Sequence, residues 1–303
     1  MSLGGDAKII GGSPAVFKAK RGGAIPAPKL LDLYPGAAAA YSLRKLRNAY
    51  AGAAVRIRRS GDNAEYDFGF TGAGDFDTAS AEAFCVAGGG TKNGYISKWY
   101  DQSGGAINYQ QTNGSKQNQI ISNGVVLTDG TNTKPVIKME ANKGLVTDSN
   151  IQVFPSKIGT ILSVFKNTAS FGTICATYQA PSGVDWQLDS STATIGYKWY
   201  SSGGGSTKIA ANLDVTTFQT QSQIRTSGTV MGIYTNGVKL QDLTIGNDQQ
   251  SANKVCLGSY QIGSVPSGDW LVGSFAEQIF WDADQSSNII TIQGNQNSYY
   301  GIY

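Results

Sequence analysis

Hydrophobic and polar residues alternate along much of the chain, the period-two pattern of strands with one buried and one exposed face. The alternation is clear in Val55–Arg59 (VRIRR) and Tyr95–Tyr100 (YISKWY). Similar short runs predict further strands at Pro135–Met139, Thr160–Phe165, Thr173–Tyr178 and Trp186–Leu188. No period of 20–50 residues repeats, so neither a solenoid nor a propeller is expected.

The clearest local signal is a hairpin in Val230–Leu240 (VMGIYTNGVKL). Asn236-Gly237 stands between two apolar runs, and a type I′ turn favours this pair because both central residues need a positive φ. A long strand is predicted over Gly273–Asp282, with Trp281 in the core. A short amphipathic tail follows it.

One segment, residues 36–50 (GAAAAYSLRKLRNAY), has a helical pattern. Ala37–Ala40 are strong helix formers, and a rough apolar stripe runs from Tyr41 to Tyr50. Gly52 would end the helix. We therefore predict an all-β sandwich with one short N-terminal helix.

Positive charge is concentrated at the N-terminal end. Up to Arg59 the chain has eleven Lys and Arg against two Asp, a net charge of +9, and the remainder has thirteen against nineteen acidic residues, a net charge of −6. Residues 1–28 are rich in Gly, Ala, Pro and Lys and have too few large apolar residues to form a core. We predict an extended basic arm over 1–28, with Lys18, Lys20 and Arg21 in assembly contacts, and one domain over 29–303.

Composition suggests an extracellular or particle-associated protein, because charged residues make up only 15% and glycine is abundant. The N-terminus has no apolar signal segment and no window resembles a membrane span. We therefore expect synthesis in a host cytoplasm and release without a signal peptide. Nucleic acid is not the expected partner of the arm, which lacks interleaved aromatic residues.

The chain has no histidine, which removes Ser-His-Asp and Cys-His catalysis and His-ligated zinc. Three cysteines, Cys85, Cys175 and Cys256, are far apart and odd in number, so they are predicted to be buried thiols and not a disulfide framework.

The C-terminal part resembles laminin-G/concanavalin-like modules. Their I-Y-x-N-G hairpin is matched by Ile233–Gly237, and their leucine-glycine step by Leu257-Gly258. Their closing G-x-[FI]-x-E-[IV] strand and the corner after it are matched by Phe275–Ile279 and Asp282–Ser286. The resemblance implies a concanavalin-like (laminin-G/jelly-roll) β-sandwich and says little about function.

Residues 31–104 contain three pieces in a fixed order. An S-x-R piece with a basic strand lies within Leu31–Ser60, Ala83–Cys85 follows it, and Tyr100–Gly104 reads Y-D-Q-S-G. In their order and spacing these pieces resemble the start of the arabinofuranosidase B catalytic domain, itself a concanavalin-like sandwich.

In that family the resemblance implies two catalytic carboxyls, as retaining glycosidases require. The acid/base Asp would fall in Leu257–Gly263, which has no carboxylate. The nucleophile stretch is similar to Met139–Leu145, but Glu140 comes too early in the chain to take the role. The paired cysteines of the family are also missing. We assign no catalytic residue and predict a non-catalytic scaffold, because loss of an acid/base costs about 10²–10⁴-fold in rate.

Five residues are candidates for ligand binding: Asp101, Gln102, Trp199, Tyr200 and Trp270. The aromatic rings border Gly- and Ser-rich loops, where they could stack on a sugar. For Asp101 the alternative is an Asx turn that accepts backbone N–H groups, with Gln102 satisfying the same loop. For the tryptophans the alternative is burial in the core.

Asp62, Asp75 and Asp77 form a loosely acidic segment. Concanavalin-like modules often bind Ca²⁺ through such oxygens, but the spacing is not that of an EF-hand. A solvated loop is the preferred interpretation, and no metal or other cofactor is assigned.

The first functional hypothesis is a bacteriophage virion protein: a head fibre, decoration or tail protein. Its arm would bind other virion proteins, and its sandwich would form a homo-oligomer or bind a host-surface glycan. The alternative is an arabinofuranosidase-like glycoside hydrolase or a secreted carbohydrate-binding module. A purely structural subunit without a ligand is the third option.

Overall fold

The computed structural model describes residues 26–87, 89–179, 183–191, 194–201, 204–211, 215–246, 252–262 and 265–303. Most of the predicted arm, including Lys18, Lys20 and Arg21, lies outside the described residues.

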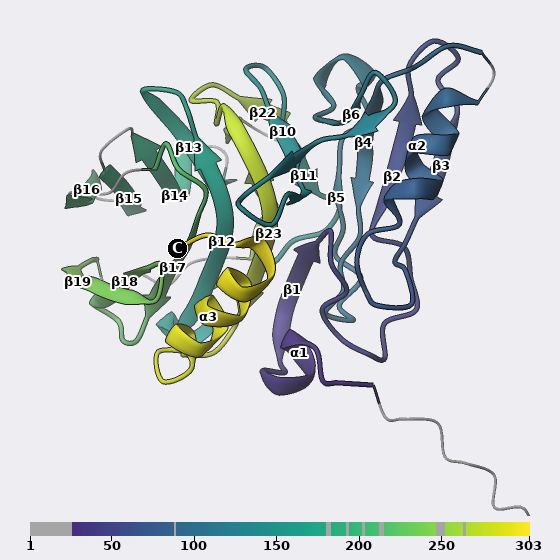
Figure 1. Cartoon of the computed structure of the whole chain (residues 1–303). Coiled ribbons are helices and arrows are strands. Elements are labelled where there is room, and N and C mark those ends of the chain that lie inside the picture. Colours follow the sequence, from purple (N-terminus) through teal and green to yellow (C-terminus); the bar gives the residue numbers. More distant parts are fainter. Residues whose placement is uncertain are drawn as a thin grey trace, which may run out of the picture.

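Strands are the main secondary structure of the described residues (Figure 1). The helices are α1 (Leu30–Leu33), α2 (Thr78–Val86) and α3 (Ile289–Tyr300), with the 3₁₀ turns η1 (Gly114–Lys116) and η2 (Pro155–Lys157). The strands are β1 (Ala37–Ser42), β2 (Val55–Arg59), β3 (Glu65–Phe68), β4 (Gly94–Trp99), β5 (Tyr109–Gln110), β6 (Gln119–Ser122), β7 (Val125–Val126), β8 (Thr128–Asp129), β9 (Lys134–Pro135), β10 (Ile137–Met139), β11 (Leu145–Thr147), β12 (Gly159–Asn167), β13 (Phe171–Gln179), β14 (Gly183–Ser191), β15 (Thr194–Ser201), β16 (Gly204–Ala211), β17 (Gln219–Arg225), β18 (Val230–Thr235), β19 (Val238–Thr244), β20 (Val255–Leu257), β21 (Tyr260–Ile262), β22 (Val265–Ser267) and β23 (Gly273–Trp281).

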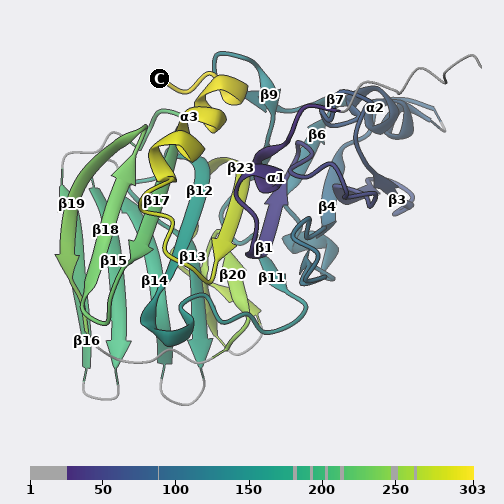
Figure 2. The same ribbon diagram turned by 90° about the horizontal axis from the view of Figure 1, so that it is seen from below.

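The strands form two antiparallel layers, which confirms the predicted β-sandwich. One layer runs β1-β23-β12-β17-β18-β19. The other runs β3-β2-β4-β5-β11-β20-β13-β14-β15-β16. Figure 2 shows the first layer in front of the second. β6 and β10 connect the layers by pairing with β4 and β23.

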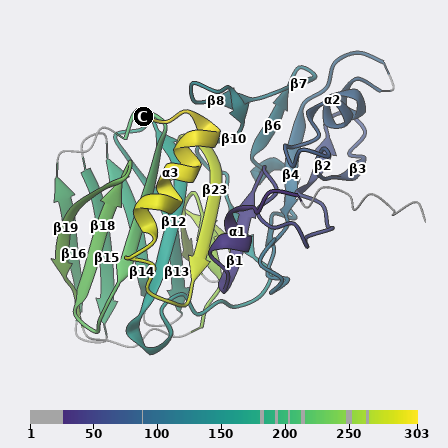
Figure 3. The same cartoon turned by 60° about the horizontal axis from the view of Figure 1, so that its bottom comes forward.

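The core has three parts, the smallest of which joins Val164, Phe218 and Tyr300. The largest cluster fills the space between the layers and includes Trp99, Phe165 and Phe275. A smaller cluster lies on the outer face of the first layer, where Ile289 and Ile292 of α3 pack near Trp281. α3 therefore lies across the outside of β12, β17 and β23 (Figure 3). None of the helices among the described residues has the length and apolar character to span a membrane.

The predicted helix over residues 36–50 is wrong, because this segment contains strand β1. β1 pairs antiparallel with β23, and Ala39, Ala40 and Tyr41 are completely buried. Alanine has a high helix propensity, but small side chains also allow a strand to be covered closely on both faces, and tertiary pairing outweighs propensity. The short N-terminal helix of the fold is α1 instead, directly before this segment.

Two helices were not predicted. In α2 the Asp77 carboxylate caps the N-terminus by accepting from the Ser80 amide at 3.2 Å, while Cys85 faces the core. The segment expected to be a short amphipathic tail is α3, which ends where Gly301 adopts a left-handed conformation. The sequence of α3 does not show a clear apolar stripe, because its buried face contains the polar residues Gln293 and Gln296.

The predicted strands lie within observed strands, apart from a residue or two at their ends, with one exception. The strand predicted over Pro135–Met139 is divided between β9, which pairs with β8, and β10, which pairs with β23. The hairpin turn is also confirmed, with φ of 49° at Asn236 and 79° at Gly237. Trp281 is completely buried, as expected.

Candidate functional site

The Asp101 side chain ties the Y-D-Q-S-G loop to the edge of β1. One carboxylate oxygen accepts from the Ala40 amide at 2.9 Å and the Ser103 amide at 2.8 Å. The other accepts from the Ser103 hydroxyl at 2.8 Å and the Ile107 amide at 3.3 Å. Asp101 is 4% exposed, and its hydrogen bonds are those of the Asx-turn interpretation.

Gln102 forms hydrogen bonds along the same edge of β1. Its backbone amide donates to the Ala40 carbonyl at 2.7 Å, and its side-chain amide donates to the carbonyls of Ser42 and Arg44. Its side-chain oxygen accepts from the Leu46 amide at 2.8 Å. The Asp101 and Gln102 side chains therefore make the hydrogen bonds to the edge of β1 that a neighbouring strand would otherwise make. Their contact with a ligand stays a prediction.

The predicted aromatic residues lie elsewhere. Trp270 is partly exposed and forms an isolated parallel bridge with Thr173 of β13. Trp199 and Tyr200 belong to β15, and their side chains lie outside the described part of the structure. The structure does not bring Trp270 together with Asp101 and Gln102.

The acidic segment divides into three separate contacts. Asp62 pairs with Arg59 at 2.5 Å, Asp75 accepts from Lys134 at 3.3 Å, and Asp77 caps α2. In the described ranges, no group of three or more Asp, Glu or Cys side chains is placed to hold a metal ion.

Glu140 is held by two cations, at 3.0 Å from Lys138 and 2.6 Å from Lys143. Burial opposes ionisation, but these two lysines lower the pKa of Glu140 below its usual value. A carboxyl with a lowered pKa is a poor general acid.

A buried ion pair joins the start of the domain to its last strand. Arg44 donates from Nε and Nη2 to the Glu277 carboxylate at 2.8 and 3.1 Å. Glu277 also accepts from the Ser42 hydroxyl, the Gln296 amide and the Tyr300 hydroxyl. These partners fix Glu277, which is completely buried.

Charge balance explains how Glu277 stays ionised there. Burial alone would raise its pKa, but the charge of Arg44 and the hydrogen bonds to it lower the pKa below the usual value. Glu277 therefore positions Arg44 and does not reach solvent.

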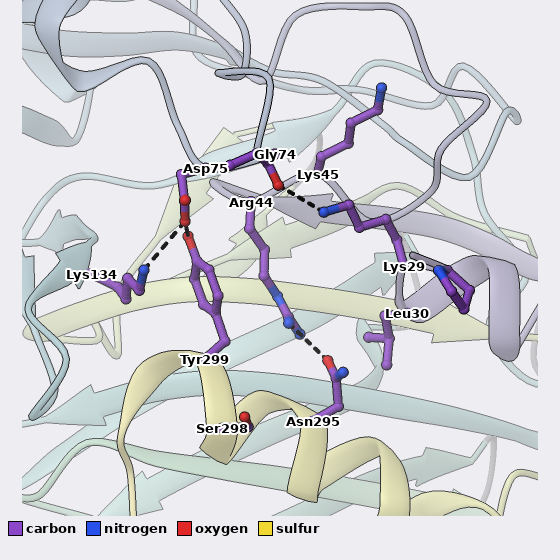
Figure 4. A pocket seen from close by; sticks show the side chains of 12 residues that line it. Lys29, Leu30, Arg44, Lys45, Gly74, Asp75, Lys134, Asn295, Ser298 and Tyr299 are labelled. Atoms are coloured by element: carbon purple, nitrogen blue, oxygen red, sulfur yellow. Dashed lines mark hydrogen bonds and ion pairs between the residues drawn. The ribbon is translucent and has the colours of Figure 1, made fainter. Parts of the chain in front are cut away.

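Beside this pair lies a polar cavity of about 390 Å³ (Figure 4). Five separate parts of the chain form it: the segment at α1, the residues after β1, the loop at Ala73–Asp75, Lys134 of β9, and α3. Its polar and charged lining side chains are Lys29, Arg44, Lys45, Asp75, Lys134, Asn295, Ser298 and Tyr299.

Hydrogen bonds arrange much of this lining. The Asp75 carboxylate accepts from the Tyr299 hydroxyl at 2.8 Å as well as from Lys134. Burial opposes the shift, but these two donors lower the pKa of Asp75. Arg44 donates to the Asn295 side chain at 2.8 Å, and its Cζ atom lies 4.9 Å from the centre of the Tyr299 ring.

The cavity is suited to binding an anion or a polyol and not to glycoside hydrolysis. Among the described residues, four cations line it and Asp75 is the only carboxylate. Hydrolysis needs two carboxyls, one of which usually has a raised pKa. The nearby Glu277 is fully used by its five hydrogen bonds.

A second, smaller cavity of about 290 Å³ lies next to the first, because Lys45 lines both. Tyr50 and Phe70 line it, with their rings 6.3 Å apart in an edge-on arrangement. Aromatic rings beside a polar cavity are typical of saccharide sites, since a ring can contact the apolar face of a sugar.

Sequence reasoning missed this cavity. Arg44 stands in the S-x-R piece of the predicted resemblance, but Lys134 lies outside the predicted elements, and the tail that contains Tyr299 was predicted without a functional role. Glu277 was noted only as part of a closing strand. A charged residue alternating into a buried strand, as Glu277 does, is the one signal that could have indicated a polar centre.

The three cysteines are completely buried, as predicted. Burial raises the pKa of Cys85 to about 11 and that of Cys256 to about 12. At neutral pH they are therefore protonated and poor nucleophiles.

Comparison with known proteins places part of the chain near glycosidases. The family model for the catalytic domain of α-L-arabinofuranosidase B matches residues 32–157. No curated protein sequence matches the chain.

Solved structures extend the likeness to most of the fold. An arabinofuranosidase complexed with arabinofuranosyl-α-1,2-xylobiose has a TM-score of 0.61 at 14% sequence identity, over 87% of this chain and 63% of that one. A GH54 α-L-arabinofuranosidase soaked with a cyclic sulfate inhibitor gives 0.60 at the same identity and coverage. The chain thus spans about 63% of the length of these enzymes and shares their β-sandwich fold.

Proposed function

We propose that the chain is a carbohydrate-binding domain on an arabinofuranosidase-type sandwich. The match of residues 32–157 to the catalytic domain of arabinofuranosidase B carries this proposal. The polar cavity beside Arg44 and its aromatic neighbour supply the groups that saccharide recognition uses: hydrogen-bond donors, a charged side chain and ring faces.

Binding is favoured over catalysis by the carboxyl groups. Asp75 and Glu140 have lowered pKa values. Burial alone would raise the pKa of both, but neighbouring lysines lower it, and at Asp75 the hydrogen bond from Tyr299 does so too. Glu277 cannot reach a substrate because its carboxylate is completely buried. The position expected for an acid/base Asp, Leu257–Gly263, has no carboxylate.

A glycan array, followed by titration with soluble arabinoxylan, arabinan and pectic polysaccharides, tests the proposal. We expect saturable binding to at least one of these glycans by folded protein. Folded protein that binds no glycan on the array and no polysaccharide in solution would overturn it.

The family match also favours a second candidate, an arabinofuranosidase. Incubation with 4-nitrophenyl α-L-arabinofuranoside separates the two. Release of nitrophenol that is lost in a variant of one carboxyl residue would establish hydrolysis. Glycan binding without release supports the binding domain.

Display on a bacteriophage particle is a separate proposal that rests on the uneven charge and the basic arm of residues 1–28. Binding to other virion proteins, homo-oligomer formation and location in a virion stay predictions. The proteome of purified particles tests them, and absence of the chain from every particle fraction would count against this role.

A further inference from the structure

We propose that the cavity beside Arg44 binds the carboxylate of an acidic sugar, such as a uronic acid residue of a glycan. The inference rests on the proposed carbohydrate-binding function and names its ligand class. Three observations support the inference. Positive charges exceed negative charges in the cavity, one of the cations has no partner among the described residues, and a cavity with two aromatic rings adjoins it.

Cations outnumber anions in and behind the cavity. Lys29, Arg44, Lys45 and Lys134 line it, and Asp75 is the only acidic residue in the part of its lining that the structure describes. Counting Glu277 behind Arg44 as a second negative charge still leaves a net charge of +2. A neutral sugar would leave this excess uncompensated, whereas a carboxylate balances part of it.

Three of the cations already have protein partners. Lys29 Nζ donates to the Ala73 carbonyl at 2.8 Å, Lys134 pairs with Asp75, and Arg44 pairs with Glu277. These contacts hold the cations in place at the wall of the cavity, so that a ligand meets a preorganised site.

Lys45 differs from the other three. Within the described ranges its ammonium group has no hydrogen bond and no ion pair, although its backbone is fixed by the Gly74 carbonyl at 2.8 Å. It also lies where the two cavities meet. Figure 4 shows the Lys45 side chain pointing away from the Arg44 guanidinium, so Lys45 is the cation available to a ligand carboxylate at a place apart from Arg44.

Arg44 adds two more donors. A guanidinium has five N–H groups. In Arg44 three of them are used, two on Glu277 and one on Asn295, which leaves one on each Nη atom. Arg44 is only 8% exposed, so a hydroxyl or other polar group of the ligand that accepts from it, at a distance from the carboxylate held by Lys45, would be largely shielded from water.

The size of the cavity favours a sugar acid over a bare inorganic anion. About 390 Å³ lies within the range of sites for small organic ligands. The adjoining cavity, which Tyr50 and Phe70 line, meets the first cavity at Lys45. It would hold the next sugar of an oligosaccharide. An acidic oligosaccharide fits this arrangement of charge and aromatic surface.

Titration calorimetry and ligand-observed NMR at low salt test the inference with glucuronate and galacturonate. Glucose and galactose are the matched neutral sugars, and inorganic phosphate is the non-sugar anion. We expect the uronates to bind at least tenfold more tightly than the neutral sugars and than phosphate.

Two variants locate the site. Lys45→Gln should weaken uronate binding at least fivefold, and Lys98→Gln, which removes a lysine of β4 outside the cavity, should leave it unchanged. Circular dichroism and thermal unfolding test whether both variants fold. We expect Lys45→Gln to fold, because the Lys45 ammonium group has no hydrogen bond or ion pair with any residue that the structure describes.

The outcomes separate this inference from the proposed function. Binding of neutral glycans that is unaffected by Lys45→Gln would overturn the acidic-sugar site and leave the carbohydrate-binding function intact. Phosphate binding as tight as uronate binding would also overturn it, since the site would then be a general anion site. No binding of any saccharide would overturn both.

Discussion

Arg44 and Glu277 are 233 residues apart in the sequence and meet in a bidentate, buried ion pair. Ser42 and Glu277 are directly paired in the register of β1 and β23, which brings Arg44, two residues further on, over the carboxylate. The pair therefore joins the first and last strands of the sandwich and holds one wall of the cavity.

Removal of one partner should be strongly destabilising. Glu277→Gln keeps the shape of the side chain but leaves the Arg44 charge buried without its counter-charge, so we expect a loss of about 3–5 kcal/mol in the free energy of unfolding. Urea denaturation measures it.

The matched control is Arg56→Gln. The Arg56–Asp67 pair also has a short contact, at 2.7 Å, but both side chains are about 40% exposed. Water already screens this pair, so its loss should cost about 0–1 kcal/mol. Equal effects of the two substitutions would contradict the role given to burial.

The same pair predicts a dependence of stability on pH. Burial opposes ionisation of Glu277, but Arg44 lowers its pKa in the folded protein. A lowered folded-state pKa stabilises the protein fully above the unfolded-state value, about 4.3 for Glu, and the stabilisation is lost as the pH falls toward the folded-state value.

The stability difference between the wild type and Glu277→Gln should accordingly stay constant from pH 7 to about 5 and narrow below that. Urea titrations at a series of pH values measure this difference. A stability difference that is unchanged down to pH 3 would contradict the lowered pKa of Glu277 in the folded protein.

We predict that Asp101 stabilises the folded protein and does not bind the ligand. Asp101→Ala leaves the Ala40 and Ser103 amides without their side-chain acceptor, and a buried unsatisfied donor costs about 1–3 kcal/mol. Asp282→Ala, at an exposed carboxylate, is the control. If Asp101→Ala abolishes glycan binding without loss of stability, Asp101 contacts the ligand instead.

Gly237→Ala tests the hairpin turn. At φ of 79° an alanine is strained, and its Cβ would lie 2.9 Å from the Tyr303 hydroxyl. We expect a loss of about 1–2 kcal/mol. Gly72→Ala should be close to neutral, because Gly72 has no positive φ and a Cβ there meets nothing within 4 Å. Thermal unfolding compares the two variants.

Strands and turns were predictable because their signals are local. Val55–Arg59 alternates over five residues, and Asn236-Gly237 specifies its own backbone. β1 was misassigned because its alanines favour a helix locally, whereas pairing with β23, distant in sequence, determines the outcome.

The cavity could not be predicted for a related reason. Lys29, Lys134 and Tyr299 come from three separate segments, and only the completed sandwich brings them near Arg44. Asp101 and Gln102 stood out in the sequence because of their motif, yet in the structure they complete the edge of β1.

The most direct test of the account is a titration of ¹⁵N-labelled protein with galacturonate, followed by NMR. The account predicts saturable shifts of the backbone amides of Arg44, Lys45, Asp75, Asn295 and Tyr299, greatly reduced in Lys45→Gln. Shifts confined to other parts of the domain, or no shifts with any acidic or neutral saccharide, would contradict it.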